Sequence, residues 1–260
     1  MLALKSSVRR LLHVLDLDLV RHTRLNRLER AAQAEDDVAF LRTLPEAAVV
    51  QALAALPNSQ SQLRQDLFVL SHCSFKKGGY FVEFGATDGK TLSNTWLLEK
   101  QFGWSGILAE PGRGWHERLR NERSARIDTD CVWSQSDADL EFIEAENAEL
   151  STLASHADGD EHARSRRNAR HYRVNTISLN DLLARHHAPS QIDYLSIDTE
   201  GSEFEILGAL DFSAYSFATI TCEHNFTANR ERIHALLREH GYVRKCEAVS
   251  RFDDWYVRSG

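Results

Sequence analysis

The sequence has few cysteines, no long hydrophobic run and no excess of positive charge, and each absence excludes a class of protein. Its four cysteines lie far apart and include no Cys-x-x-Cys pair, which argues against a zinc site or a disulfide framework. No stretch approaches the ~20 apolar residues that a bilayer-spanning helix needs. The apolar N-terminus is interrupted by Asp16 and Asp18, and no signal-peptide cleavage site follows. We therefore expect a cytoplasmic protein with free thiols.

The charge balance excludes a general nucleic-acid binder. The chain carries a formal net charge of -7 at pH 7 over 260 residues, whereas phosphate backbones are bound through basic surfaces. Its 42% hydrophobic and 27% charged content is ordinary for a folded protein. This length accommodates one large α/β domain and a smaller appendage.

The predicted appendage is a helical extension over residues 1–60. Within residues 1–30, apolar residues recur at three- and four-residue steps, and seven basic side chains outnumber three acidic ones. Such a helix fits docking on a partner subunit, a glycosyltransferase or an anionic membrane surface, with packing on its own domain as the alternative. A second helical stretch is expected at residues 35–56, with a stop or kink at Pro45. We predict a homo-oligomer whose main domain is residues 61–260.

Residues 80–90, YFVEFGATDGK, are typical of a strand, a glycine turn and the start of a helix that we expect at residues 91–102. Gly85 would let a ligand approach the backbone closely, although two glycines at such a turn can also be purely structural. The acidic residues Glu83 and Asp88 would repel a pyrophosphate, which disfavours a dinucleotide. They suit the sulfonium and ammonium groups of S-adenosylmethionine (SAM), with its amino-acid end over Gly85.

The next two predicted strands supply the remaining cofactor contacts. A carboxylate at the end of the first, Glu110, can accept hydrogen bonds from both ribose hydroxyls. The second, at residues 125–132, ends in Asp130, Cys131 and Val132, which we expect beside the adenine. Asp130 would accept from the exocyclic amine, and Val132 would pack on the ring.

Strands and helices alternate through the rest of the chain. We expect strands at residues 192–197, 217–222, 241–248 and 254–258, with helices between them and a short extra strand at residues 140–145. The pattern predicts an α/β, Rossmann-like sheet of seven mostly parallel strands with an antiparallel C-terminal hairpin. A polar loop at residues 147–168 is expected as a lid or acceptor-binding surface.

Several motifs resemble one family. They are residues 81–89, Ser93-Asn94-Thr95, Leu98-Glu99-Lys100, residues 103–106, Glu110-Pro111, and IDTEGSE at residues 197–203, preceded by Ser61-Gln62 and Gln65-Asp66. From about Ser61 onward the chain resembles the FkbM-type SAM-dependent methyltransferases. The resemblance implies a class I methyltransferase fold and methyl transfer to a hydroxyl, commonly on a sugar or secondary metabolite. With the motifs above, it assigns cofactor contacts to Gln65, Glu83, Gly85, Ala86, Asp88, Gly89, Ser93, Asn94, Glu110, Pro111, Asp130, Cys131, Val132 and Asp198.

The ends of the fourth and fifth core strands should face the transferred methyl group, because ligands gather at the carboxyl edge of such a sheet. A sugar hydroxyl needs a general base or a divalent metal to become a good nucleophile. We expect catalytic roles for Asp198, His224 and Glu223, with His224 or Asp198 as the base. The alternative is Mg²⁺ held by Asp198, Glu223 and Asn225.

Two other functions stay open at this stage. An oxidoreductase with a nucleotide cofactor is disfavoured by the acidic glycine turn. A catalytically inactive scaffold, recruited through the N-terminal helix, would keep the fold without the reaction.

Overall fold

The structure, a computed structural model of the whole chain, describes residues 22–144, 152–153, 170–199 and 201–259. The chain divides into two compact units, one ending at Arg42 and one beginning at Thr43. The first unit contains α2 (His22–Leu41), a continuous 20-residue helix. It runs through residues 31–34, where the sequence analysis expected a break between two N-terminal helices. Its side chains Leu25 and Leu28 are 44% and 52% exposed. The rest of the predicted docking segment, residues 1–21, and most of the predicted polar loop lie outside the described residues.

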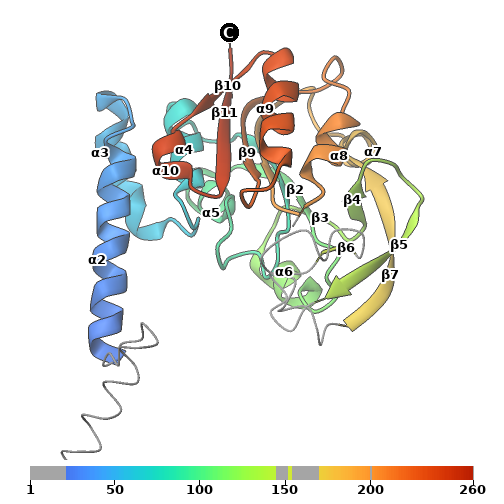
Figure 1. Cartoon of the computed structure of the whole chain (residues 1–260), viewed down its shortest axis with the longest axis horizontal. Coiled ribbons are helices and arrows are strands. Elements are labelled where there is room, and N and C mark those ends of the chain that lie inside the picture. Colours follow the sequence, from blue (N-terminus) through green and yellow to red (C-terminus); the bar gives the residue numbers. More distant parts are fainter. Residues whose placement is uncertain (1–21, 145–151, 154–169, 200, 260) are drawn as a thin grey trace, which may run out of the picture. The chain divides into compact units, whose positions relative to one another are not determined.

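The second unit is built on a seven-stranded sheet with the order β10-β11-β9-β8-β1-β2-β3. Every neighbouring pair is parallel except that β11 runs antiparallel to both β9 and β10. The predicted sheet and its C-terminal hairpin are thus confirmed (Figure 1). The strands are β1 (Tyr80–Phe84), β2 (Ser105–Ala109), β3 (Arg126–Asp128), β8 (Gln191–Ile197), β9 (Ser216–Glu223), β10 (Tyr242–Lys245) and β11 (Asp253–Arg258).

Helices cover both faces of this sheet, as expected for alternating strands and helices. One face packs its apolar side chains, among them Val82, Leu195 and Ile220, against α7 (Leu179–Arg185), α8 (Glu203–Gly208) and α9 (Asn229–Glu239). The opposite face is covered by α4 (Gln65–His72) and α5 (Trp96–Phe102), on the other side of the sheet in Figure 1. The remaining helical segments are α3 (Glu46–Ala55), which Pro45 precedes as predicted, η1 (Leu56–Asn58), α6 (His116–Glu122) and α10 (Glu247–Ser250).

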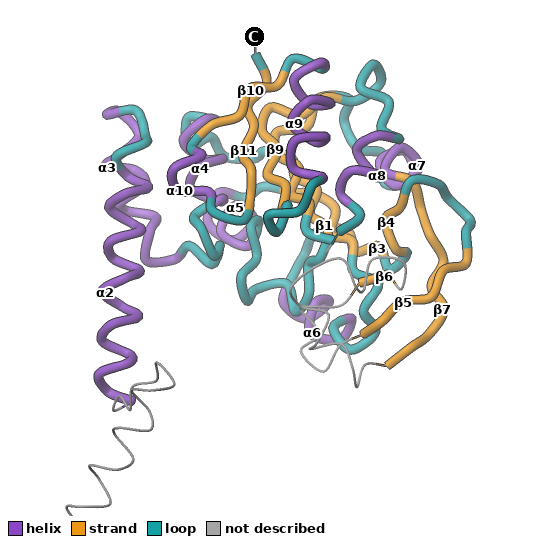
Figure 2. The backbone as a smooth tube through the Cα atoms, in the orientation of Figure 1, coloured by secondary structure: helices purple, strands orange, loops and turns teal. Residues whose placement is uncertain are grey.

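A second, smaller sheet with the order β4-β7-β5-β6 corrects the predicted third strand (Figure 2). The chain leaves the main sheet after Asp128, and β4 (Cys131–Trp133) pairs instead with β7 (Arg170–Ser178). The short extra strand was predicted and is β5 (Asp139–Glu144), which pairs with β6 (Thr152–Leu153) and β7. Strand β7 was not predicted, because most of its residues are polar and its alternation is irregular: Val174 is buried between exposed neighbours, but residues 176–178 are all buried.

Two helix starts also differ from the expectation. Helix α5 begins at Trp96 rather than at residue 91, because Leu92 adopts a left-handed conformation with φ 59° and the hydroxyls of Ser93 and Thr95 donate to the buried Glu83 carboxylate. Helix α4 begins at Gln65 rather than Ser61, because Arg64 adopts a left-handed conformation with φ 71°. None of the described helices is long and apolar enough to cross a membrane.

Candidate cofactor and acceptor site

The turn after β1 lies directly against the end of β8. Gly85 has φ 71°, and a Cβ added there would lie 2.4 Å from the carbonyl oxygen of Asp198. Both residues are exposed, and β1 and β8 are parallel neighbours, so their carboxyl ends meet at one edge. The predicted juxtaposition of the glycine turn and Asp198 is therefore present. Only glycine combines this backbone conformation with so close an approach.

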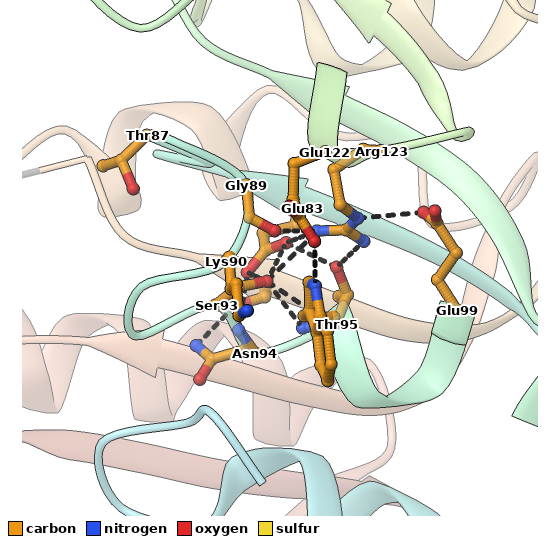
Figure 3. A network of polar contacts seen from close by, with 12 residues as sticks. Glu83, Thr87, Gly89, Lys90, Ser93, Asn94, Thr95, Glu99, Glu122 and Arg123 are labelled. Carbon is orange, nitrogen blue, oxygen red and sulfur yellow. Dashed lines mark hydrogen bonds and ion pairs between the residues drawn. The ribbon is translucent and has the colours of Figure 1, made fainter. Parts of the chain in front are cut away.

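Glu83, at the end of β1, holds the following loop in place. Its buried carboxylate accepts hydrogen bonds from the Ser93 hydroxyl at 3.1 and 3.2 Å, from the Asn94 amide at 2.7 Å and from the Thr95 hydroxyl (Figure 3). Burial raises the pKa of Glu83, and the nearby Arg123 guanidinium opposes that shift. The predicted contact of Glu83 with the cofactor remains a prediction, since its oxygens are occupied by its own chain.

Arg123 is the partner that the sequence analysis missed. Its guanidinium is buried, 3.7 Å from Glu83 and 2.9 Å from Glu99, and it donates to the Gly89 carbonyl at 2.9 Å and to the Thr95 hydroxyl at 2.8 Å (Figure 3). A Cβ at Gly89, with φ 83°, would lie 2.7 Å from the Arg123 side chain. Gly89 is thus required for packing against Arg123. A lone arginine at the end of a polar helix carried no sequence signal for this role.

Asn94 presents a free oxygen at the same edge. Its Nδ2 donates to the Ser196 hydroxyl on β8 at 3.0 Å, whereas its buried Oδ1 has no hydrogen-bond partner among the described residues. A buried acceptor without a donor is costly unless a ligand or water supplies one. Its position fits the predicted contact with the ammonium group of a cofactor. Ser93, by contrast, is buried in the network around Glu83.

Asp88 caps the glycine turn. Its carboxylate accepts from the Lys90 amide at 2.9 Å and from the amide and hydroxyl of Thr91, each at 2.8 Å. Burial alone would raise the pKa of Asp88, but these hydrogen bonds outweigh it and lower the pKa. Ala86, in the same turn, is buried, and its amide lies 3.5 Å from the Ala109 carbonyl. No described contact assigns Asp88 or Ala86 to a ligand, so their predicted cofactor contacts stay predictions.

Glu110 lies at the end of β2 beside this turn, where a ribose was predicted. Its two oxygens accept from the Thr87 amide at 2.8 Å and the Gly112 amide at 2.7 Å, so the carboxylate joins the β1 turn to the segment after Pro111. Burial raises the pKa of Glu110 to about 7, with the negative charges of Glu144 and Asp198 acting in the same direction. Each carboxylate oxygen can accept a second hydrogen bond, which leaves capacity for ribose hydroxyls.

The residues predicted beside the adenine follow the end of β3, and their contacts with an adenine stay predictions. The carboxylate of Asp130 lies 2.7 Å from the Arg185 guanidinium, so an ion pair already engages the expected amine acceptor. Cys131 belongs to the core of the second sheet with Phe142, and Val132 packs into the main core. These positions follow from the early end of β3, because the chain turns away from the main sheet before reaching them.

At the start of β11, Gln65 forms a hydrogen bond with Asp253, an acidic residue to which the sequence analysis gave no role. Its Nε2 donates to Asp253 Oδ2 at 3.0 Å, and Trp255 Nε1 donates to the same oxygen at 3.0 Å. Burial raises the pKa of Asp253 to about 8, with the negative charges of Asp198 and Asp254 acting in the same direction. Gln65 is predicted on the cofactor, whereas the last predicted strand begins at residue 254 and leaves Asp253 without a role. An acidic residue where an antiparallel strand begins beside a ligand edge was the available signal.

The predicted role of His224 as the base stays a prediction, and the structure shows what surrounds its ring. Its Nδ1 accepts a hydrogen bond from the Phe226 amide at 3.0 Å, so the lone pair that would take a proton is occupied. Its Nε2 lies 3.7 Å from Asp254 Oδ1, on the face where Arg230 also binds Asp254. Burial lowers the pKa of His224, and the charges of Arg230 and Arg244 lower it further against the opposing effect of Asp254. This geometry fits a structural histidine.

The metal alternative gains no support. Across the residues that the structure describes, no group of three or more His, Cys, Asp and Glu side chains is arranged to hold a metal ion. Glu223, on the other hand, lies opposite Asp253 in the β9–β11 pairing, at the same edge of the sheet. Asn225 follows with φ 43° and Phe226 with φ 55°, and Phe226 is 70% exposed.

The topology defines the class of protein: the order β3-β2-β1-β8-β9-β11-β10, with β11 antiparallel, is that of a class I methyltransferase. Residues 83–244 match the family described as Methyltransferase FkbM domain. This match covers more than half of the chain, so the chain belongs to the FkbM methyltransferase family, as the motifs predicted. No curated protein matches the chain.

The solved structures that the chain resembles share little sequence identity with it. The chain is similar to methyltransferase FkbM from Methylobacillus flagellatus KT, with 12% identity, a TM-score of 0.46, and coverage of 88% of this chain and 60% of that one. It is also similar to precorrin-6y C5,15-methyltransferase from Geobacter metallireducens GS-15, with 11% identity, a TM-score of 0.36, and coverage of 69% and 71%. The chain thus spans 60% of the length of the FkbM structure.

Proposed function

We propose that this methyltransferase transfers the methyl group of SAM to a hydroxyl of a saccharide or glycan intermediate. The observation that carries the cofactor assignment is the charge around the glycine turn. Three buried carboxyl groups, Glu110, Glu203 and Asp253, lie close enough to Asp198 for its charge to add to the effect of burial on their pKa values. An edge with so many carboxyl groups suits a ligand with a sulfonium and an ammonium group, because a bound cation favours their ionised forms.

The proposed fit of SAM uses groups that are available at this edge. The exposed backbone at Gly85 and the free Oδ1 of Asn94 would receive the amino-acid end. The remaining acceptor capacity of Glu110 would hold the ribose. When bound, SAM supplies an activated methyl group for displacement by a nucleophile. The protein then has to place the acceptor oxygen in line with that methyl group, which alone can lower the barrier by roughly 7 kcal/mol.

The acceptor assignment rests on the family and on the surface after β9. An exposed aromatic side chain at Phe226 suits a polyhydroxylated ligand, because an aromatic ring can cover the apolar C–H face of a sugar. The left-handed conformations of Asn225 and Phe226 are uncommon outside glycine. Such strain is often retained where a side chain must be aimed at a ligand.

Binding experiments test the cofactor. We expect SAM and S-adenosylhomocysteine (SAH) to raise the melting temperature, since a ligand at a hundred times its dissociation constant adds about 2.7 kcal/mol to stability. NAD should have no effect. Absence of any shift with both adenosyl ligands would overturn the proposal.

A transfer assay tests the acceptor. We would incubate the enzyme with SAM labelled in its methyl group and with methyl glycosides of glucose, galactose, mannose and rhamnose. Labelled ether products support O-methylation of saccharides. Binding of SAM without labelling of these glycosides or of a total glycan extract would favour the inactive scaffold instead.

We also propose that the N-terminal helices mediate self-association or docking on a glycosyltransferase or membrane surface. The exposed Leu25 and Leu28 on α2 support an apolar contact. Light scattering on the wild type and on the Leu25→Ser/Leu28→Ser variant tests this, with a fall in mass expected for the variant. A wild-type monomer that also fails to bind anionic vesicles would contradict the proposal.

A further inference from the structure

Asp253 occupies the acceptor end of the sheet although it lies far from the motifs in sequence. It is the first residue of β11, which runs antiparallel to β9, so Asp253 pairs with Glu223 where β9 ends. Side chains alternate along a strand, and the next residue on the same face, Trp255, contacts Phe68 of α4 with ring centroids 4.9 Å apart. Asp253 therefore faces α4 at the edge where ligands gather.

One oxygen of this carboxyl group is fixed from two sides. Oδ2 accepts from Gln65 Nε2 and from Trp255 Nε1, each at 3.0 Å. The amide of Gln65 is itself oriented, because its Oε1 accepts from the Leu63 backbone amide at 2.9 Å. These donors determine the direction of the carboxyl group without using its second oxygen.

The second oxygen, Oδ1, is buried and has no hydrogen-bond partner among the described residues. The next residue, Asp254, shows the contrast: Arg230 binds both of its oxygens, at 2.9 and 3.1 Å, and Arg244 donates to it at 3.1 Å. The charges of Asp198 and Asp254, both negative, act on Asp253. An oriented, buried acceptor atom without a donor indicates a ligand that brings one.

We propose that Asp253 Oδ1 accepts the hydrogen of the acceptor hydroxyl and takes its proton during methyl transfer, with Gln65 and Trp255 as positioning residues. This inference rests on the proposed function. The hydroxyl oxygen forms a bond to the methyl carbon as the carbon–sulfur bond breaks. The sulfur keeps the electron pair and becomes the thioether of SAH, and the proton moves to Asp253. The sum is one methyl ether, SAH and a protonated carboxyl group.

A cofactor analogue tests this placement without knowledge of the acceptor. In sinefungin, a carbon bearing an amino group replaces the methylated sulfur, so an ammonium group occupies the place of the transferred methyl. It should donate to the oxygen that lies beyond the methyl. We expect the wild type to bind sinefungin more tightly than SAH, and Asp253→Asn to reduce this preference at least about 10-fold while its SAH affinity changes less than about 2-fold.

The substitution should preserve the fold, because the Asn carbonyl can still accept from Gln65 and Trp255 and the wild-type group already has a pKa of about 8. Asp254→Asn is the matched control. This variant loses the ion pairs of Asp254 with Arg230 and Arg244, so its melting temperature should fall. It should still prefer sinefungin to SAH. Gln65→Leu should reduce the preference less than Asp253→Asn does.

Two results would overturn the inference: an unchanged sinefungin preference in Asp253→Asn, or a loss of preference equally large in Asp254→Asn. Transfer gives a second readout, with a fall of about 100-fold or more in kcat for Asp253→Asn on any glycoside that the enzyme methylates. Failure of the wild type to bind SAH or sinefungin would refute the proposed function itself, and is thereby distinguished from failure of the Asp253 assignment.

Discussion

The two ends of the ligand edge use buried carboxylates in opposite ways. At the end of β1, Glu83 is surrounded by donors and by the Arg123 guanidinium. At the start of β11, Asp253 has donors on one oxygen, negative neighbours and a free second oxygen. Both are fully buried acids at strand ends. What separates a structural carboxylate from a reactive one is therefore its set of partners rather than its residue type or position.

Removal of the charge at Arg123 tests the structural role of Glu83, and it should have the largest effect on stability. Arg123→Met leaves Glu83 buried without its counter-ion and should lower the free energy of unfolding by about 3–5 kcal/mol. Urea denaturation measures it. The double variant Glu83→Gln/Arg123→Met should recover part of the loss, because no unpaired charge remains. If the single variant loses less than about 1 kcal/mol in the free energy of unfolding, Glu83 does not have a structural role.

Gly85→Ala acts between the two ends, where the β1 turn touches β8. The new Cβ would lie 2.4 Å from the Asp198 carbonyl oxygen at a φ of 71°, so we expect a loss of about 2–3 kcal/mol and at least 10-fold weaker SAH binding. Gly103→Ala is the matched control, with φ 66° and no atom within 4 Å of the added Cβ. It should cost about 1 kcal/mol and leave SAH binding unchanged. Equal effects in both variants would show that backbone conformation alone matters.

Proton release on cofactor binding tests the carboxyl groups that are proposed to face the ligand. The pKa of Glu110 is raised to about 7 and that of Asp253 to about 8, so both groups carry protons near neutral pH. A bound cation favours their charged forms, and SAM binding should release roughly one proton at pH 7.5. Affinity for SAM should then rise between pH 6 and pH 8, by at most ~10-fold per unit for each proton released.

Calorimetry in two buffers of different ionisation enthalpy measures this release. SAH lacks the sulfonium charge and should release less, and Asp253→Asn should release less than the wild type. Because these two acids have folded-state pKa values above their unfolded ones, their contribution to the stability of the unliganded enzyme falls as pH rises from about 4 to about 8. No proton uptake or release with SAM would place the cation away from both groups.

The sequence predicted the parts of this site that depend on local patterns. The glycine turn, the mostly parallel sheet with its C-terminal hairpin and the position of Asp198 at the carboxyl edge follow from apolar periodicity and from parallel neighbours sharing that edge. The pairing of Glu83 with Arg123, and of Gln65 with Asp253 across 188 residues, joins segments that no local pattern connects. Strand β7 was missed because its mostly polar residues show no regular alternation, and because its partner β4 was predicted as part of the main sheet.

The smallest effect is expected at Asp88, the acidic residue that the sequence placed on the cofactor and the structure places on the turn. Asp88→Ala removes three hydrogen bonds from Lys90 and Thr91, but the site is half-exposed and water can replace them, so we expect a loss of up to about 1 kcal/mol. SAH affinity should change less than about 2-fold if the carboxylate serves only the turn. A 10-fold weaker affinity with unchanged stability would instead put Asp88 in contact with the cofactor, and both ends of the edge would then have to be counted as ligand-binding.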